Sequence, residues 1–102
     1  MTITPQKARH FRTLGHRLKP VVTVASKGLT ENICREVERA LADHELIKVS
    51  IKVGDRSQRA DICEAICDQC QATLVQLTGN VALIYRPAPH PNPKLSNLLR
   101  PL

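Results

Sequence analysis

Hydrophobic and polar residues recur with two different periods along this chain, and each change of period marks a predicted element. Phe11, Leu14 and Leu18 are spaced three or four residues apart, as on one buried face of a helix. Thr4-Pro5 is a suitable start, because Thr can cap a helix and Pro fits a first position whose N–H would have no partner. Pro20 cannot continue a helix, so we expect the first helix to end before it.

A strand and a second helix are expected next. The segment VVTVA, residues 21–25, is short, apolar and β-branched, which predicts a strand covered on both faces. Residues 26–28 form a turn, and Thr30 can cap the helix that follows. The apolar stripe of that helix consists of Ile33, Val37, Ala40 and Leu41.

The second half of the chain adds a strand, a helix and a hairpin. Residues 47–53 alternate between apolar and polar side chains, which predicts a half-buried strand that Gly54-Asp55 ends. We expect a third helix from its N-cap Ser57 to about Cys70. The runs TLVQLT and VALIYR are joined by Gly79-Asn80, which is typical of a two-residue hairpin turn.

The predicted order is therefore α-β-α-β-α-β-β. Two strand–helix units need crossover helices and the last two strands pair antiparallel, so the sequence predicts an α/β fold with a four-stranded mixed sheet. We assign this domain to residues 1–87. Five prolines occur in the sixteen residues after Arg86, so residues 88–102 are expected to form an extended or flexible tail. The alternative is that Leu95, Leu98 and Leu99 dock as a short helical turn.

Length and composition exclude several classes of protein. A chain of 102 residues is too short for a large enzyme barrel or a full doubly wound nucleotide-binding fold. No apolar run approaches the roughly 18 residues that span a bilayer, and the N-terminus has no apolar segment typical of a signal peptide. We therefore expect a cytoplasmic protein with no membrane partner, whose four cysteines are free thiols.

Charge is distributed unevenly along the chain. There are 15 Lys and Arg against nine Asp and Glu, and every acid lies between Glu31 and Asp68. Residues 1–30 hold six Lys or Arg and no acid. A basic region of this kind favours a polyanionic partner such as a nucleic acid, and the alternative is that the charge only keeps the protein soluble.

The first helix is the strongest candidate for contact with a polyanion. Arg9, Arg12 and His16 lie on one stripe of a helical wheel, with Arg17 beside it and no acid to neutralise them. The alternative is an ordinary solvated face. In the second helix acids and bases are mixed, so only a solvated surface is expected there.

The loop Ala25-Ser26-Lys27-Gly28 is a second candidate, because it joins a strand to a helix. Amide groups at a helix N-terminus can bind an anion, and Lys27 adds a charge. No GxxxxGK[ST] motif is present, so nucleotide hydrolysis has no support. The alternative is a tight turn with Gly28 at positive φ.

The cysteines and histidines do not indicate catalysis. Cys63, Cys67 and Cys70 read CxxxCxxC, a spacing known from iron–sulfur radical enzymes, but those enzymes need a far larger barrel. On a helix the three share one face, so we expect core packing and no metal or cofactor. No histidine suggests a nucleophile–base pair, and a capping or turn role is expected for His44-Glu45. The protein is therefore predicted not to be an enzyme and to have no small-molecule substrate.

Three stretches, LKPVVTVASKGLTENI, HELIKVSI and GNVALIYRP, resemble the CRM domain, the chloroplast RNA splicing and ribosome maturation family. The resemblance covers about residues 4–87, and the stand-alone bacterial members are YhbY-type proteins. It implies a fold similar to the C-terminal domain of translation initiation factor 3, RNA binding, and association with precursors of the large ribosomal subunit. The family's GxxG loop, like that of KH domains, matches residues 25–28, where Ala25 replaces the first Gly.

These observations combine into one predicted RNA-binding surface, in which basic side chains contact phosphates and the loop clamps the backbone. Its residues are Lys7, Arg9, Arg12, His16, Arg17, Lys19, Ala25, Ser26, Lys27 and Gly28. Lys48 and Lys52 could extend it. One Phe and one Tyr cannot form a stacking platform, so little sequence preference is expected. The alternatives are a protein-interaction adaptor that uses the Pro-rich tail, and a thiol or metal-binding protein that uses the cysteine face.

Overall fold

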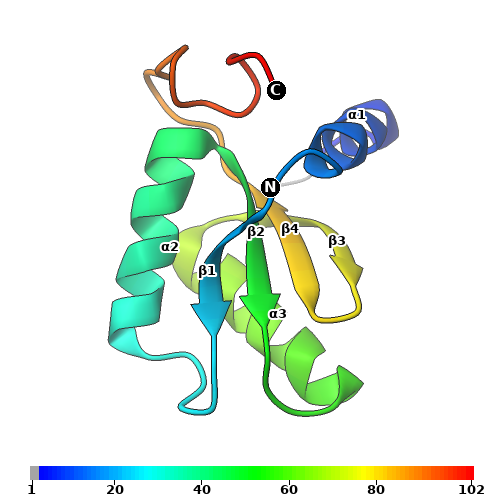
Figure 1. Cartoon of the computed structure of the whole chain (residues 1–102), viewed down its shortest axis with the longest axis vertical. Coiled ribbons are helices and arrows are strands. Elements are labelled where there is room, and N and C mark those ends of the chain that lie inside the picture. Colours follow the sequence, from blue (N-terminus) through cyan, green and yellow to red (C-terminus); the bar gives the residue numbers. More distant parts are fainter. Residues whose placement is uncertain (1–2) are drawn as a thin grey trace.

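Seven elements follow one another in the order that the sequence predicts. The computed structural model describes residues 3–102. Its elements are α1 (Pro5–Gly15), β1 (Pro20–Val24), α2 (Glu31–His44), β2 (Leu46–Ile51), α3 (Arg56–Cys70), β3 (Thr73–Thr78) and β4 (Val81–Tyr85). The strands form a single sheet in the order β1-β2-β4-β3 (Figure 1). Strand β1 is parallel to β2 and the other pairs are antiparallel, which confirms the four-stranded mixed sheet.

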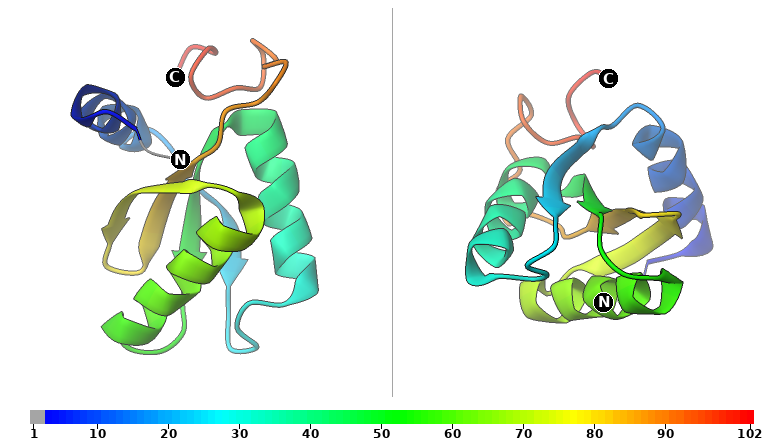
Figure 2. Two further views of the ribbon diagram at one scale, coloured as in Figure 1. Left: turned by 180° about the vertical axis from the view of Figure 1, so that it is seen from behind. Right: turned by 60° about the horizontal axis from the view of Figure 1, so that its bottom comes forward.

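Helices cover the two faces of the sheet to different extents (Figure 2). Helices α2 and α3 pack on one face, where Leu41 and Ile66 meet the strand residues Val24, Val49 and Ile84 in the main core. Helix α1 lies over one end of the other face. No helix covers the β1 part of that face, where Val21 and Thr23 are exposed, although Ser50 of β2 is buried.

Helix α1 approaches the sheet closely because its last residue is a glycine. Phe11 is buried in a second cluster with Leu46, Leu83 and Tyr85. A Cβ atom on Gly15 would lie 2.8 Å from Cδ2 of Leu83, so a larger residue would require either the Leu83 side chain or the helix to shift. Gly15, which weakens the helix in sequence terms, therefore brings α1 onto β4.

Three local expectations were wrong. Strand β2, expected to be half-buried over residues 47–53, ends at Ile51 and is buried on both faces: five of its six residues are buried and only Lys48 is half-buried. Strand β1 is buried on one face only: Val22 and Val24 are in the core, whereas Val21 is 50% exposed because no helix covers its side. The N-cap of α3 is Asp55 rather than Ser57. Its carboxylate accepts from Gln58 N at 2.9 Å and the Gln58 side chain accepts from Asp55 N at 2.8 Å, a reciprocal capping box that Ser57 does not make.

The Pro-rich tail lies against the domain, which differs from the extended or flexible segment expected from its composition (Figure 1). Ser96 and Asn97 are buried at the junction of α2 and β2. Backbone bonds from Ser96 N to Asn92 O and from Arg100 N to Ser96 O form the helical turns that carry these residues. The tail therefore covers the end of the sheet next to α1.

Glu45 explains why the tail is held at that junction. This residue ends α2 with a φ of 63°, in the capping role expected for His44-Glu45, and is only 5% exposed. One carboxylate oxygen accepts from Ser96 Oγ at 2.7 Å and the other from Ala88 N at 2.9 Å. A buried carboxylate without such partners would be costly, so both bonds favour the docked tail.

Candidate nucleic-acid interface

The polar face of α1 follows from how the helix starts and what it buries. Thr4 Oγ1 accepts from Lys7 N at 3.1 Å, which caps the helix as the sequence predicts. With Phe11 turned to the sheet, Lys7 and Arg9 are exposed and Arg12 is half-buried. An Arg in this position covers apolar surface with its stem while its charged head stays in water.

The residues between α1 and β1 continue this basic face. His16, Arg17 and Lys19 are all exposed. The guanidinium of Arg17 is engaged by the tail, because its Nη1 donates to Leu102 O at 2.9 Å. The structure thus gathers six of the predicted residues on and directly after α1.

The loop of residues 25–28 forms a tight turn in which Gly28 N donates to Ala25 O at 2.8 Å. Gly28 has a φ of +72°, as expected, and a Cβ there would meet open space. Ser26 and Lys27 are exposed. The loop therefore presents a cation and a backbone turn directly to solvent.

The N-terminus of α2 itself offers little to an anion. Thr30 Oγ1 accepts from Ile33 N at 3.2 Å, and Glu31 places a carboxylate in the first turn. A side-chain cap and a negative charge already satisfy this end of the helix. Lys27 and the turn, rather than the helix terminus, are what this loop can contribute.

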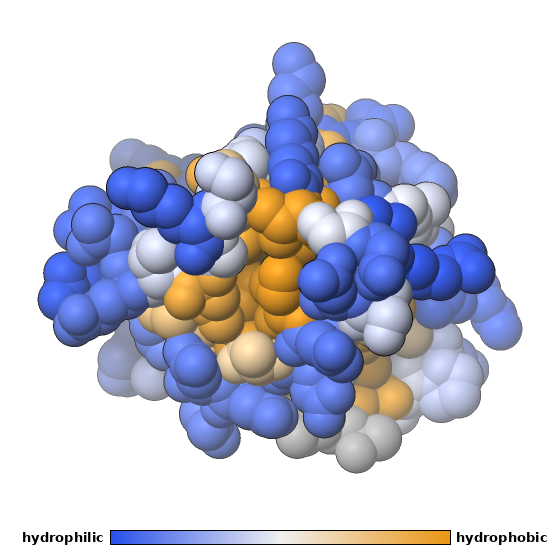
Figure 3. Space-filling view, turned by 90° about the horizontal axis from the view of Figure 1, so that it is seen from below, coloured by the Kyte–Doolittle hydropathy of each residue, from blue (hydrophilic) through white to orange (hydrophobic). Residues whose placement is uncertain are grey.

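The two predicted groups lie at opposite ends of β1 (Figure 1). The five residues of β1 separate Lys19 from Ala25, and the six residue steps between them correspond to about 20 Å of extended strand. Figure 3 views the molecule from below, at the end that carries the loop. Apolar residues lie at the centre of this view and hydrophilic residues surround them. The ten predicted residues therefore do not form one contiguous cluster.

Strand β2 supplies the cations that lie between the two groups. Lys48 lines a recess of about 360 Å³ together with His16 and Leu83, so it faces the side of the sheet that carries α1. Lys52 is exposed, and its N–H donates to Val24 O at 2.8 Å, directly before the loop. The expected extension by Lys48 and Lys52 thus runs along the open sheet face from α1 to the loop.

Carboxylates are concentrated on the other face of the sheet. Elements α1, β1, β3 and β4 contain no Asp or Glu, and Glu45 on the α1 side is buried under the tail. Ion pairs of 2.7 Å join Arg35 to Glu31 within α2, and Arg86 to Glu38. The segregation of charge along the sequence thus becomes a separation in space.

Neither aromatic side chain is available to a ligand. Phe11 and Tyr85 are both buried, and their tilted rings pack with centroids 4.6 Å apart. Burial, together with the charge of Glu45, raises the pKa of the Tyr85 hydroxyl. Any contact of this surface with RNA has to use charge, hydrogen bonds and shape.

The cysteine face is part of the main core. Cys63 and Cys70 are buried there, which confirms the packing expected for them, and Cys67 is half-buried. Burial raises the pKa of Cys67 and of Cys70 to about 11. Since the thiolate is the reactive form, these thiols are poor nucleophiles at neutral pH.

Two further features of residues 3–102 bear on function. No group of three or more His, Cys, Asp or Glu side chains within this range is arranged to hold a metal ion. No helix in the same range is long and apolar enough to cross a membrane.

Comparison with known proteins places the chain in a family. The CRS1 / YhbY (CRM) domain matches residues 3–86, from before α1 to the end of β4. The chain belongs to the CRM family. A CRM-domain fold therefore comprises all seven elements described above, and the match ends before the tail.

Individual relatives agree with this assignment. A Pseudomonas aeruginosa protein named as a probable RNA-binding protein is 46% identical over 100 residues, covering 98% of this chain and 96% of its own. A Haemophilus influenzae RNA-binding protein is 38% identical over 87 residues, or 85% and 88% of the two chains. The solution structure of a Staphylococcus aureus protein, described as a candidate for RNA binding, superposes with a TM-score of 0.77. It is 26% identical and covers 87% of this chain and 93% of its own.

Proposed function

We propose that this protein binds RNA without catalysing a reaction, and that its target is ribosomal RNA in cytoplasmic precursors of the large ribosomal subunit. The observation that carries RNA binding is the face formed by α1, β1 and β2, three elements that contain no Asp or Glu and that include the exposed Lys7 and Arg9. The names of the relatives support the same class of ligand. The ribosomal target follows from the resemblance to the CRM family.

Binding on this face is built mainly from phosphate contacts. Arg9 and Lys7 of α1 neutralise phosphates at one end, and Lys27 with its turn contacts the backbone at the other. Lys48 and Lys52 lie between them along β2 and allow one RNA segment to follow the open sheet. Because Phe11 and Tyr85 are both buried, the shape of the RNA matters more than its base sequence.

One experiment tests RNA binding itself, and a second tests the ribosomal target. Titration of the full chain with structured and single-stranded RNA at several salt concentrations should give affinities that fall linearly with log salt. Affinity-tagged protein in cells should co-sediment with large-subunit precursors and crosslink to their RNA. Absence of RNA affinity at low salt would contradict the function, and crosslinks confined to other RNAs would contradict only the ribosomal target.

The structure does not favour the two alternative functions. An adaptor role requires a Pro-rich tail that is free to bind a partner, whereas hydrogen bonds from Ala88, Ser96 and Asn97 hold this tail against the domain, with residues 89–95 exposed. A thiol or metal role requires reactive cysteines, whereas Cys63 and Cys70 are buried.

A further inference from the structure

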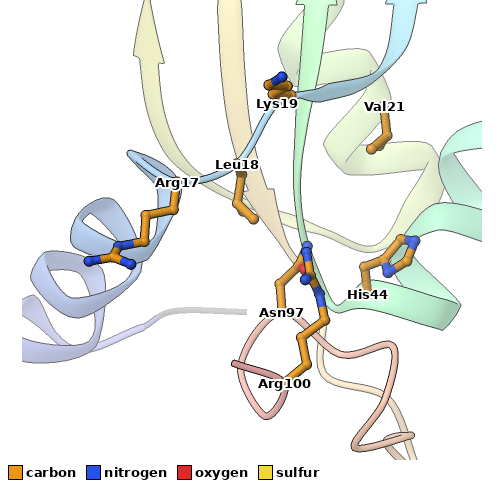
Figure 4. Close-up of a pocket in the computed structure, with 7 residues that line it drawn as sticks. All are labelled: Arg17, Leu18, Lys19, Val21, His44, Asn97 and Arg100. Carbon is orange, nitrogen blue, oxygen red and sulfur yellow. The ribbon is translucent and has the colours of Figure 1, made fainter. Parts of the chain in front are cut away.

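A recess of about 300 Å³ lies where the tail meets the start of β1 (Figure 4). Three separate segments line it: residues 17–21 between α1 and β1, His44 at the end of α2, and Asn97 with Arg100 in the tail. In the close-up, Arg100 extends alongside Asn97 into the space between Leu18 and His44. The recess exists only because the tail is docked.

The charge in this recess is positive and unbalanced. Arg17, Lys19 and Arg100 contribute cations, and none of the residues that line it is an acid. Arg17 points away toward α1, where it donates to Leu102 O. Lys19 and Arg100 form no ion pair with any residue in the range 3–102. These two side chains are therefore the ones left for an external anion.

Arg100 is held in position by a buried side chain. Asn97 is 6% exposed, and its N and Nδ2 donate to His44 O at 2.9 Å and Leu46 O at 2.7 Å. Its remaining polar atom, Oδ1, accepts from Arg100 Nε at 2.7 Å. The guanidinium is thus oriented through Nε, which keeps its two terminal nitrogens for a ligand.

The tail that carries Asn97 and Arg100 is itself anchored in the core. Ser96 and Ala88 satisfy both oxygens of the buried Glu45 carboxylate, and His44 Nδ1 lies 2.8 Å from Leu95 O. An ordered Arg loses less conformational entropy on binding than a freely rotating one. Pre-organisation of this kind distinguishes Arg100 from an ordinary surface cation.

We infer that the tail completes a phosphate-binding pocket, in which Arg100 holds a phosphate group of an RNA chain that lies along α1 and Lys19 adds positive charge to the lining. This inference rests on the proposed RNA binding and extends it to residues outside the CRM match, which ends at residue 86. An arginine fork suits the phosphate group because two parallel N–H donors can meet two of its oxygens. The pocket continues the basic face of α1 across the tail.

The test compares Arg100→Ala with a matched change elsewhere in the tail. Lys94→Ala removes the same charge from an exposed tail residue that does not line the pocket. Each phosphate contact contributes about −0.7 to the slope of log K against log salt for single-stranded RNA. Losing one contact should therefore lower affinity about fivefold at roughly 0.1 M salt and make that slope shallower by about 0.7. We expect this loss for Arg100→Ala, little change for Lys94→Ala, and only partial recovery in Arg100→Lys, which restores the charge without the fork or the bond to Asn97.

Each outcome separates this inference from the proposed function. Wild-type affinity and salt slope in a folded Arg100→Ala protein would overturn the pocket while leaving RNA binding intact. An equal loss in Lys94→Ala would also overturn it, because the effect would then be general charge. If the wild-type protein itself binds no RNA, the proposed function fails first. Circular dichroism and the thermal midpoint of each variant show whether the fold is intact.

The source of the phosphate is identified by a second comparison. The same RNA is titrated with a 5′-hydroxyl and with a 5′-phosphate. An Arg100 effect of equal size on both indicates an internal phosphodiester, and an effect only on the phosphorylated RNA indicates the terminal phosphate. No Arg100 effect on either RNA would overturn the pocket.

Discussion

The two faces of one sheet differ in what they leave unpaired. On the face covered by α2 and α3, apolar side chains fill the core and exposed charges include both signs, as in the pairs Arg35–Glu31 and Arg86–Glu38. On the face that carries α1, the helix covers only one end, and its exposed cations have no Asp or Glu within the helix to pair with. The face covered by α2 and α3 therefore contributes the main core, whereas the face that carries α1 contributes the charge available for binding.

This difference between the two faces costs the folded state little free energy. Exposed ion pairs contribute only about 0–1 kcal/mol each, so leaving cations unpaired on α1 costs little stability. The same cations release condensed counterions when they meet a nucleic acid, which provides affinity. Substitutions on the two faces should therefore affect different measurements.

Charge reversal on α1 should have the largest effect on RNA affinity. Arg9→Glu combined with Arg12→Glu removes two phosphate contacts, worth about 25-fold at roughly 0.1 M salt, and adds repulsion. Stability should change by no more than about 0.5 kcal/mol per site, because Arg9 is exposed and neither side chain belongs to the buried core. Fluorescence anisotropy with labelled RNA measures the loss.

The matched control is the same change of charge on the opposite face. Arg35→Glu combined with Arg39→Glu on α2 should alter affinity far less, although it disrupts the pair with Glu31. Equal losses in the two double variants would show that net charge, and not the α1 face, governs binding.

Removal of the loop cation should have a smaller effect. Lys27→Ala eliminates one contact, so affinity should fall about fivefold at roughly 0.1 M salt and the salt slope should flatten by about 0.7. The effect should be similar for different RNA sequences, because a phosphate contact does not read bases. Wild-type affinity in this variant would mean that the loop is only a turn and that RNA stays near α1.

Restoring the family's first loop glycine should change affinity still less. Ala25 does not have a positive φ, so its backbone does not require glycine, and Ala25→Gly leaves the charge unaltered. We expect an unchanged salt slope and an affinity that is level or slightly higher. Stability should fall by about 0.4–1 kcal/mol, because Gly increases the freedom of the unfolded chain. A marked loss of RNA affinity would contradict this expectation.

The buried cysteines should affect stability and leave RNA affinity unchanged. Burial raises the pKa of Cys67 and Cys70 from 9.0 to about 11, so the folded protein favours their neutral thiols. This contribution to stability is present below pH 9 and is lost as the pH rises through 11, because the unfolded chain releases these protons first.

The measurement is the urea midpoint on both sides of this range, at about pH 8 and about pH 10.5. The midpoint should fall with pH in the wild type and fall less in a Cys67→Ala, Cys70→Ala variant. RNA affinity of the folded variant should match the wild type. The same fall in both proteins would contradict the assignment to these thiols.

What the sequence determined by itself is the set of elements and the distribution of charge. Helix and strand periods are local properties, so the order of elements and the caps at Thr4 and Thr30 are visible in a few neighbouring residues. The parallel and antiparallel pairings also followed, because connection type restricts them. The acid-free first 30 residues could be located without coordinates.

Only the tertiary structure decided which surfaces these elements share. It left one side of β1 uncovered, buried Tyr85 against Phe11, and placed Lys48 beside α1. It also docked the tail: Ser96 meets Glu45 across 51 residues of chain. Composition reports how a segment behaves without partners, whereas docking depends on partner groups that distant residues supply, and the fold alone brings those groups together.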